Sequence, residues 1–180
     1  MNNITQIAEM MVELVKSELD GEITLTAIEQ TTRVLLQEVG RQTVENTLKT
    51  MNPPYPEPRT ACSCGAEAAY VRRRPARLHT LFGKLQVTRA YYLCATCHQG
   101  TYPLDKKLGL RPNGLSAELA RLAAMTGVQL PFGAGRDLLE ALTLVSVRDQ
   151  ALGKATRQVG EKVVAQKEMW QASATEESFL

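Results

Sequence analysis

The chain has 180 residues, of which 44% are hydrophobic and 22% are charged. These proportions are typical of a folded protein with one or two small domains, and they exclude a disordered or low-complexity chain. No apolar run approaches the ~20 residues of a membrane-spanning helix, and the N-terminal segment mixes acidic with apolar residues, unlike a signal peptide. We therefore expect a cytoplasmic protein with no membrane partner.

The formal net charge of +2 hides an uneven distribution of charge along the chain. Residues 1–58 carry a net charge of −5, residues 59–111 carry +8, and residues 112–180 carry −1. A basic segment between neutral or acidic flanks favours a module that faces a polyanion.

The N-terminal region is predicted to form a helical hairpin, which we assign to residues 1–52. Apolar residues recur at spacings of three and four over residues 4–15 and again over residues 28–48, with a break at Asp20-Gly21-Glu22. Such a hairpin buries little apolar surface by itself, so we expect it either to self-associate or to dock on the rest of the chain. Four prolines then predict a short, stiff linker over residues 53–61.

The cysteines are the most specific feature of the sequence. They form two close pairs, Cys62-Ser63-Cys64 and Cys94-Ala95-Thr96-Cys97, which 29 residues separate. In a reducing compartment this layout is typical of a four-thiolate zinc site, whereas ordinary reduced thiols or a redox pair are the alternatives. His79 and His98 are weaker metal-ligand candidates, and a solvent-facing or phosphate-facing position is favoured for His98. The predicted ligands of a structural Zn²⁺ ion are Cys62, Cys64, Cys94 and Cys97.

Between the cysteine pairs the sequence predicts a β hairpin, and we assign a zinc ribbon to residues 62–111. Residues 85–93 alternate in the way of a half-buried strand, the turn lies at Phe82-Gly83-Lys84, and Pro75 interrupts the preceding strand. Guanidinium groups match phosphate oxygens in pairs, so we expect the basic residues here to contact phosphate; a merely solvated edge is the alternative. These residues are Arg72, Arg73, Arg74, Arg77, Lys84 and Arg89.

Residues 112–168 are predicted to form three short helices that are compatible with a helix-turn-helix unit. Ser116 can cap the first helix, which Gly127 closes. The second covers residues 136–142, and Ser146 can cap the third. Opposite the apolar arc of the third helix lie three polar residues that would meet bases and phosphates in a major groove; a helical bundle without a ligand is the alternative. They are Gln150, Lys154 and Arg157.

Together these elements predict an α+β fold with an N-terminal helical hairpin, a small β zinc ribbon and a C-terminal three-helix, helix-turn-helix-like bundle. Residues 169–180 are expected to form a flexible tail. We expect no small-molecule substrate.

Four short motifs join the two cysteine pairs as landmarks: Thr80-Leu81-Phe82-Gly83, Arg89-Ala90-Tyr91-Tyr92, Pro103-Leu104-Asp105 and Leu108-Gly109-Leu110. With these motifs, residues 62–132 resemble the N-terminal region of the ISKra family of bacterial insertion-sequence transposases. The resemblance implies that the zinc ribbon and the helix-turn-helix part bind double-stranded DNA at terminal inverted repeats. In complete family members it further implies an RNase H-like domain with a DDE acidic triad and a divalent metal.

Only 20 residues follow Gly160, which is too few for a catalytic domain of more than ~100 residues. We therefore expect a nucleoid-associated protein that recognises insertion-sequence ends in DNA transposition and has no strand-transfer activity of its own. Its expected protein partner is a second copy of the chain or a separately encoded catalytic subunit. The alternative functions are a zinc ribbon that binds RNA or the ribosome, and a zinc-containing adaptor for protein interactions.

Overall fold

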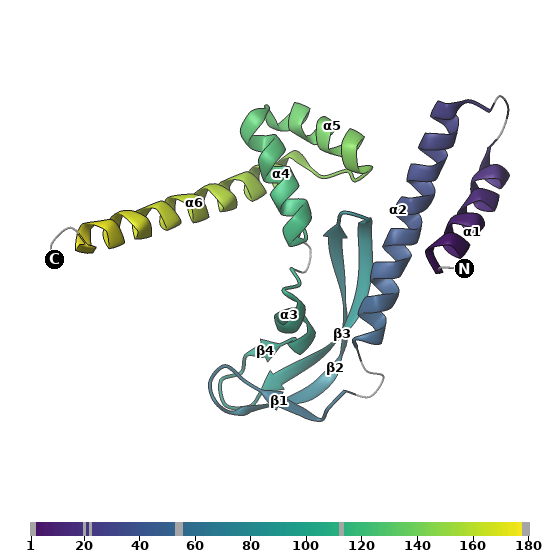
Figure 1. Ribbon diagram of the computed structural model, residues 1–180. Coiled ribbons are helices and arrows are strands. Elements are labelled where there is room, and N and C mark those ends of the chain that lie inside the picture. Colours follow the sequence, from purple (N-terminus) through teal and green to yellow (C-terminus); the bar gives the residue numbers. More distant parts are fainter. Residues whose placement is uncertain (1–2, 20, 22, 53–55, 112–113, 178–180) are drawn as a thin grey trace.

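The computed structural model describes residues 3–19, 21, 23–52, 56–111 and 114–177. In this part of the chain, six helices accompany one antiparallel sheet of four strands in the order β1-β2-β3-β4 (Figure 1), which confirms the predicted α+β class. The elements in chain order are α1 (Asn3–Glu18), α2 (Leu25–Thr50), β1 (Arg59–Ala61), β2 (Glu67–Thr80), β3 (Gly83–Cys94), β4 (Gly100–Thr101), α3 (Pro103–Leu108), α4 (Ala117–Gln129), α5 (Phe132–Thr143) and α6 (Asp149–Glu177).

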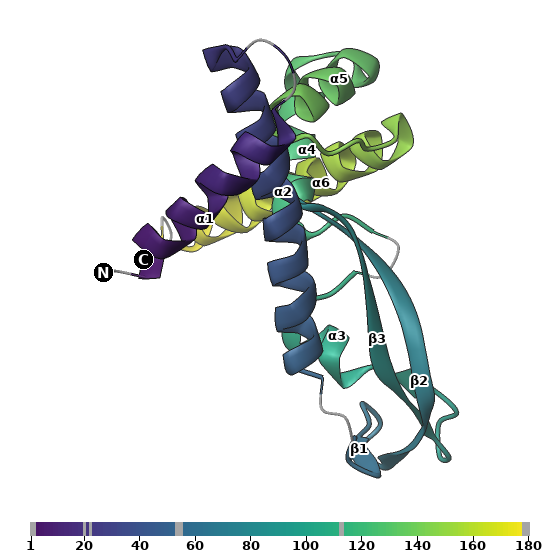
Figure 2. The ribbon, with the colours of Figure 1, turned by 90° about the vertical axis from the view of Figure 1, so that its right-hand side faces the viewer.

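Helix α2 lies along the β2–β3 hairpin, and α1 packs on α2 (Figures 1 and 2). The buried Leu48 and the half-buried Val44 of α2 pack on one face of the sheet, where four side chains form a core. The four are Ala76, Leu78, Leu85 and Val87. The sequence predicted that the N-terminal helices either self-associate or dock on the rest of the chain. The second half of α2 docks on the sheet.

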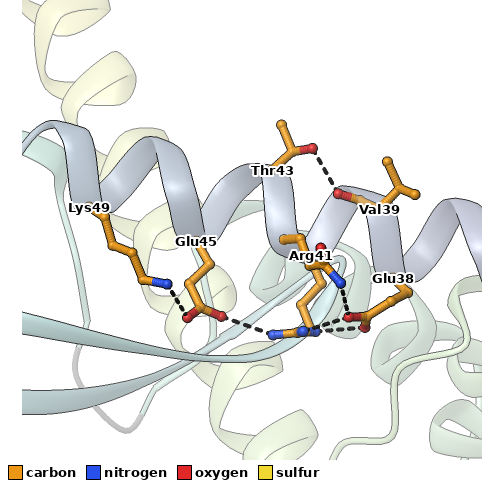
Figure 3. A network of polar contacts seen from close by, with 7 residues as sticks. Glu38, Val39, Arg41, Thr43, Glu45 and Lys49 are labelled. Atoms are coloured by element: carbon orange, nitrogen blue, oxygen red, sulfur yellow. Dashed lines mark hydrogen bonds and ion pairs between the residues drawn. The ribbon is translucent and has the colours of Figure 1, made fainter. Parts of the chain in front are cut away.

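Ion pairs along one side of α2 stabilise this long helix (Figure 3). Lys49 pairs with Glu45 and Glu45 with Arg41, each at 2.9 Å, and Arg41 pairs with Glu38 at 2.6 Å. A hydrogen bond from Arg41, and to a smaller extent one from Gln42, lowers the pKa of Glu38 to about 2. Pairs three and four residues apart support a helix whose apolar stripe is weak.

The N-terminal half of α2 also joins the two halves of the molecule. The Arg33 guanidinium donates to the carbonyl oxygens of Ala141 at 3.0 Å and Leu142 at 3.1 Å, at the end of α5. One turn further on, the Gln37 side chain donates to the carbonyl of Leu81 at 2.8 Å, in the turn of the β2–β3 hairpin. One helix therefore contacts both the hairpin and the C-terminal helices.

The face of the hairpin that is buried changes along its length. Residues 85–93 alternate as predicted, and near the turn the odd-numbered side chains from Leu85 to Arg89 are buried. Near the cysteines the even-numbered Tyr92 and Cys94 are buried instead. A register shift in β2 over Tyr70–Arg72 accompanies the change, and such a bulge increases the local twist of a strand pair.

The C-terminal helices share one core, but their ends differ from those predicted. Ser116 caps α4, as predicted, by accepting a hydrogen bond from the amide of Leu119. Gly127 does not end this helix, which continues to Gln129. Instead Gly127 allows α4 and α6 to approach, because a Cβ at this position would overlap the side chains of Leu152 and Thr156.

Helix α6 is longer than the sequence predicted. It begins at Asp149 rather than directly after Ser146, and it continues to Glu177, through residues that we expected to be a tail. The chain after Gly160 contains neither glycine nor proline, so it holds no strong stop signal. The helix projects away from the other elements (Figure 1).

Two further predictions concern the linker and the membrane. Strand β1 begins at Arg59, inside the predicted linker, and residues 53–55 of that linker lie outside the described residues. None of the helices in the described ranges has both the length and the apolar character that crossing a membrane requires.

Candidate metal centre and basic groove

The four predicted metal ligands meet at one end of the sheet. Cys62 and Cys64 lie in the turn between β1 and β2, and Cys94 and Cys97 lie at the turn between β3 and β4. The Sγ atoms of Cys62 and Cys97 are 3.5 Å apart, those of Cys64 and Cys94 are 3.6 Å apart, and all four lie within 4.8 Å of one another. This cluster can hold a metal ion, and His98 is not part of it.

The two cysteine turns reach this geometry through similar backbone bonds. In the first, the amide of Gly65 donates to the carbonyl of Cys62 at 3.1 Å; in the second, the amide of His98 donates to the carbonyl of Cys94 at 3.0 Å. Gly65 and His98 both adopt left-handed backbone angles, with φ of 88° and 56°. The short C-x-C spacing of the first pair is therefore accommodated by a glycine that turns the chain back at once.

The thiols of the cluster are not equivalent acids. The amides of Cys97 and Thr96 donate toward the Cys94 sulfur and lower the pKa of Cys94 to about 6. The amide of Gln99 lowers the pKa of Cys97, but burial and the three neighbouring sulfurs outweigh it and raise this pKa to about 12. Four thiolates in so small a volume repel one another, so their complete ionisation requires a bound cation.

The register of the hairpin divides the predicted phosphate contacts between two faces of the sheet. Arg72 lies opposite Tyr91, on the face that α2 covers further along, and Arg74 stacks over the Tyr91 ring at 4.0 Å. The half-buried Arg73, with the exposed Arg77 and Lys84, belongs to the other face. The three consecutive arginines therefore point in two directions, and Arg74 serves in part to pack a tyrosine.

Arg89 is not available to phosphate, contrary to the prediction. Only 4% of this residue is exposed, because its guanidinium forms an ion pair with Asp105 of α3 and lies 4.1 Å above the Tyr102 ring. Burial raises the pKa of Asp105, and the charge of Arg89 beside it acts in the opposite direction. Arg89 and Asp105 thus join α3 to the sheet.

A groove of about 1010 Å³ lies between the open face of the hairpin and α6. Four of the predicted nucleic-acid contacts line it, although they come from segments about 70 residues apart: Arg77, Lys84, Gln150 and Lys154. Arg157 is exposed on α6 but is not among the lining residues. The fold therefore brings the arginine-rich hairpin and the polar arc of the third helix to one surface.

The groove also contains basic residues to which the sequence analysis assigned no contact. Arg111 borders it from the segment before α4, Arg148 borders it from the loop before α6, and His79 lies at the end of β2. Among the described residues that line the groove, Glu161 is the only acidic one. Arg111 contributes to the positive charge of the middle segment, but no spacing rule links it to Arg148.

Comparison with known proteins adds no assignment, since no protein-family model, curated protein or solved structure matches the chain. The resemblance to the ISKra transposases stays a prediction.

Proposed function

We propose that the chain is the DNA-binding portion of a transposase of the ISKra type, which recognises insertion-sequence ends through the basic groove. The observation that carries this proposal is the convergence of Arg77, Lys84, Lys154 and Arg148 on one groove. Cations from separate elements that line one concave surface favour a polyanion over a neutral ligand.

We further propose that the four cysteines bind structural Zn²⁺. Zinc bound tetrahedrally by thiolates, with Zn–S distances near 2.3 Å, requires sulfur atoms that are about 3.8 Å apart. The two measured contacts, at 3.5 Å and 3.6 Å, are close to this value. Four thiolate ligands leave no open coordination position, so the ion would stabilise the cysteine turns rather than activate water.

The lining of the groove favours duplex DNA over single-stranded RNA. Proteins that bind unpaired bases stack them on aromatic side chains. No phenylalanine, tyrosine or tryptophan is among the described residues that line this groove. Its cations instead suit a sugar–phosphate backbone. Gln150 lines the groove from the start of α6, and we infer that it contacts base edges.

Gel-shift titration of the full chain tests the proposed function. We expect terminal-repeat duplex to bind more tightly than random duplex and than a structured RNA of equal length. Equal affinity for repeat and random duplex would contradict recognition of insertion-sequence ends, and a preference for the RNA would favour the alternative function.

The salt dependence of binding tests the groove itself. Each phosphate that the protein neutralises contributes about −0.9 to the slope of log K against log salt on duplex DNA. Lys154→Gln and Arg77→Gln should each make the slope shallower by about this amount. The matched control, Lys16→Gln on α1, removes an exposed lysine that pairs with Glu13, and it should leave the slope unchanged. A slope near zero in the parent chain would favour a protein-interaction adaptor.

Elemental analysis of anaerobically purified protein tests the metal. We expect one zinc ion per chain, and its loss in Cys94→Ser. Protein that contains no metal and nevertheless keeps its cysteine turns ordered would contradict the zinc proposal.

A further inference from the structure

His79 lies at the end of β2, on the face of the hairpin that borders the basic groove. Lys84 is its partner across the hairpin, and Arg148 lines the groove from the loop before α6. Burial lowers the pKa of His79 from its ordinary value of 6.5, and the positive charges of Lys84 and Arg148 lower it further. Burial and these two positive charges therefore favour the neutral form of the imidazole.

Backbone hydrogen bonds fix the position of this histidine. Its amide donates to the carbonyl of Gly114 at 3.2 Å, and its carbonyl accepts from the amide of Ser116 at 2.7 Å. Ser116 is also the residue that caps α4. The segment directly before α4 thus holds the backbone of His79 in place at the end of β2.

We propose that His79, Lys84 and Arg148 form one phosphate-binding site, at which a nucleic-acid phosphodiester binds together with a proton taken up by His79. This inference rests on the proposed function and names the contact that the groove makes. A phosphodiester brings a negative charge close to the two cations that oppose protonation of the imidazole, so it favours the imidazolium form. The imidazolium then donates an N–H to a phosphate oxygen, which is a charge-assisted hydrogen bond.

The other charged groups around the site act in the same direction. Arg77 on the same strand, Arg111 before α4, and Lys154 on α6 add positive charge, and Glu161 on α6 is the single carboxylate among the described lining residues. The field in the groove is positive, so it keeps His79 neutral until an anion enters. A net acidic lining would instead favour the protonated histidine before binding.

Because His79 takes up a proton when the phosphodiester binds, the affinity for DNA depends on pH. The imidazole of the free protein gains its proton only at low pH, whereas in the complex it gains the proton at a higher pH. Affinity for duplex DNA therefore rises as the pH falls through the pKa of the complex, and it levels off below the pKa of the free protein. A difference of one pKa unit between the two states corresponds to a change in affinity of about tenfold.

Fluorescence anisotropy with a labelled terminal-repeat duplex at constant ionic strength measures this change. We expect the full chain to bind about tenfold more tightly at about pH 5.5 than at about pH 8. His79→Gln should lose this gain, so that its affinities at the two pH values differ by much less than tenfold. The other histidine provides a matched control, because His98 lies in the second cysteine turn and not among the groove residues, so His98→Asn should keep the gain.

A second variant and a second measurement keep the test independent of one substitution. Lys84→Gln removes a cation that opposes protonation of the free imidazole, so the gain between the two pH values should shrink. Titration of the His79 imidazole by NMR should shift to higher pH when duplex or inorganic phosphate is added.

The outcomes separate this site from the proposed function. If duplex binds but His79→Gln shows the same pH dependence as the parent chain, the phosphate site is overturned and DNA binding stands. If duplex does not bind at any pH, the proposed function fails, and the inorganic phosphate titration decides the site alone. An upward shift of the His79 titration supports the site, and an unchanged titration overturns it.

Discussion

One glycine, Gly65, lets the backbone turn at the candidate metal centre. Gly65 has φ of 88° directly after the C-x-C pair, whereas Gly160 lies on an exposed part of α6 with ordinary helical geometry and no heavy atom within 4 Å of an added Cβ. A side chain in the left-handed region costs about 1–2 kcal/mol, and glycine within a helix costs about 1 kcal/mol relative to alanine.

The same substitution should therefore have opposite effects at these two glycines. We expect Gly65→Ala to lower the free energy of unfolding by about 1–2 kcal/mol and to weaken metal binding, because the Cys64 sulfur is displaced. Gly160→Ala should raise the free energy of unfolding by about 1 kcal/mol and leave metal binding unchanged. Urea denaturation of the metal-bound protein measures both values. A neutral or stabilising Gly65→Ala would contradict the role of the left-handed turn in holding the sulfurs.

Among the secondary-structure elements, the short helix α3 is attached to the sheet by a buried ion pair and by Leu104, which packs in the core beneath α2. Its Asp105 pairs with Arg89 of β3, and their side chains are only 15% and 5% exposed. Removing one member of a buried pair leaves the other charge without compensation, which costs about 3–5 kcal/mol. The exposed pair of Arg136 and Asp137 offers a comparison, because exposed pairs contribute about 0–1 kcal/mol.

We therefore expect Asp105→Ala to destabilise the protein by about 3–5 kcal/mol and Asp137→Ala by less than about 1 kcal/mol in chemical denaturation. The double variant Arg89→Met, Asp105→Leu should lose less stability than Asp105→Ala, because no charge then remains buried. It should also keep the salt dependence of DNA binding, since Arg89 faces the core. A shallower salt slope in the double variant would restore Arg89 to the set of phosphate contacts.

At the scale of elements, local spacing predicts some features of the fold and misses others. The cysteine cluster and the cap at Ser116 follow from local spacing, so both were predictable. Alternation in β3 indicates which side chains share a face, but it does not say which element covers that face, and the burial of Arg89 was missed for this reason. Gly127 carries a typical stop signal, yet its meaning depends on Leu152 and Thr156 of another helix. To predict the groove, one must know which element faces each side of the hairpin and which residues of a distant helix lie beside it. No spacing rule supplies either.

Across the whole molecule, the candidate metal centre and the basic groove lie at opposite ends of the β2–β3 hairpin. Cys94 is ten residues from Lys84 along β3, which corresponds to roughly 33 Å of extended strand. Separate groups of buried side chains hold the two ends: Ala68 and Tyr92 beside the cysteines, and Leu78 and Leu85 beneath α2 near the turn. The C-terminal helices have a third core of their own.

Removal of the metal should therefore affect the two ends unequally. The cysteine end has a small apolar core, so we expect a bound metal ion to supply much of its stability, whereas α2 packs on the other end of the hairpin. With a chelator present, we expect faster amide hydrogen exchange over residues 62–70 and 92–101, and little change over residues 119–155. The salt slope of DNA binding should keep the contribution of Arg77 and Lys84. Uniformly faster exchange across the chain would show instead that the metal stabilises the entire fold as one cooperative unit.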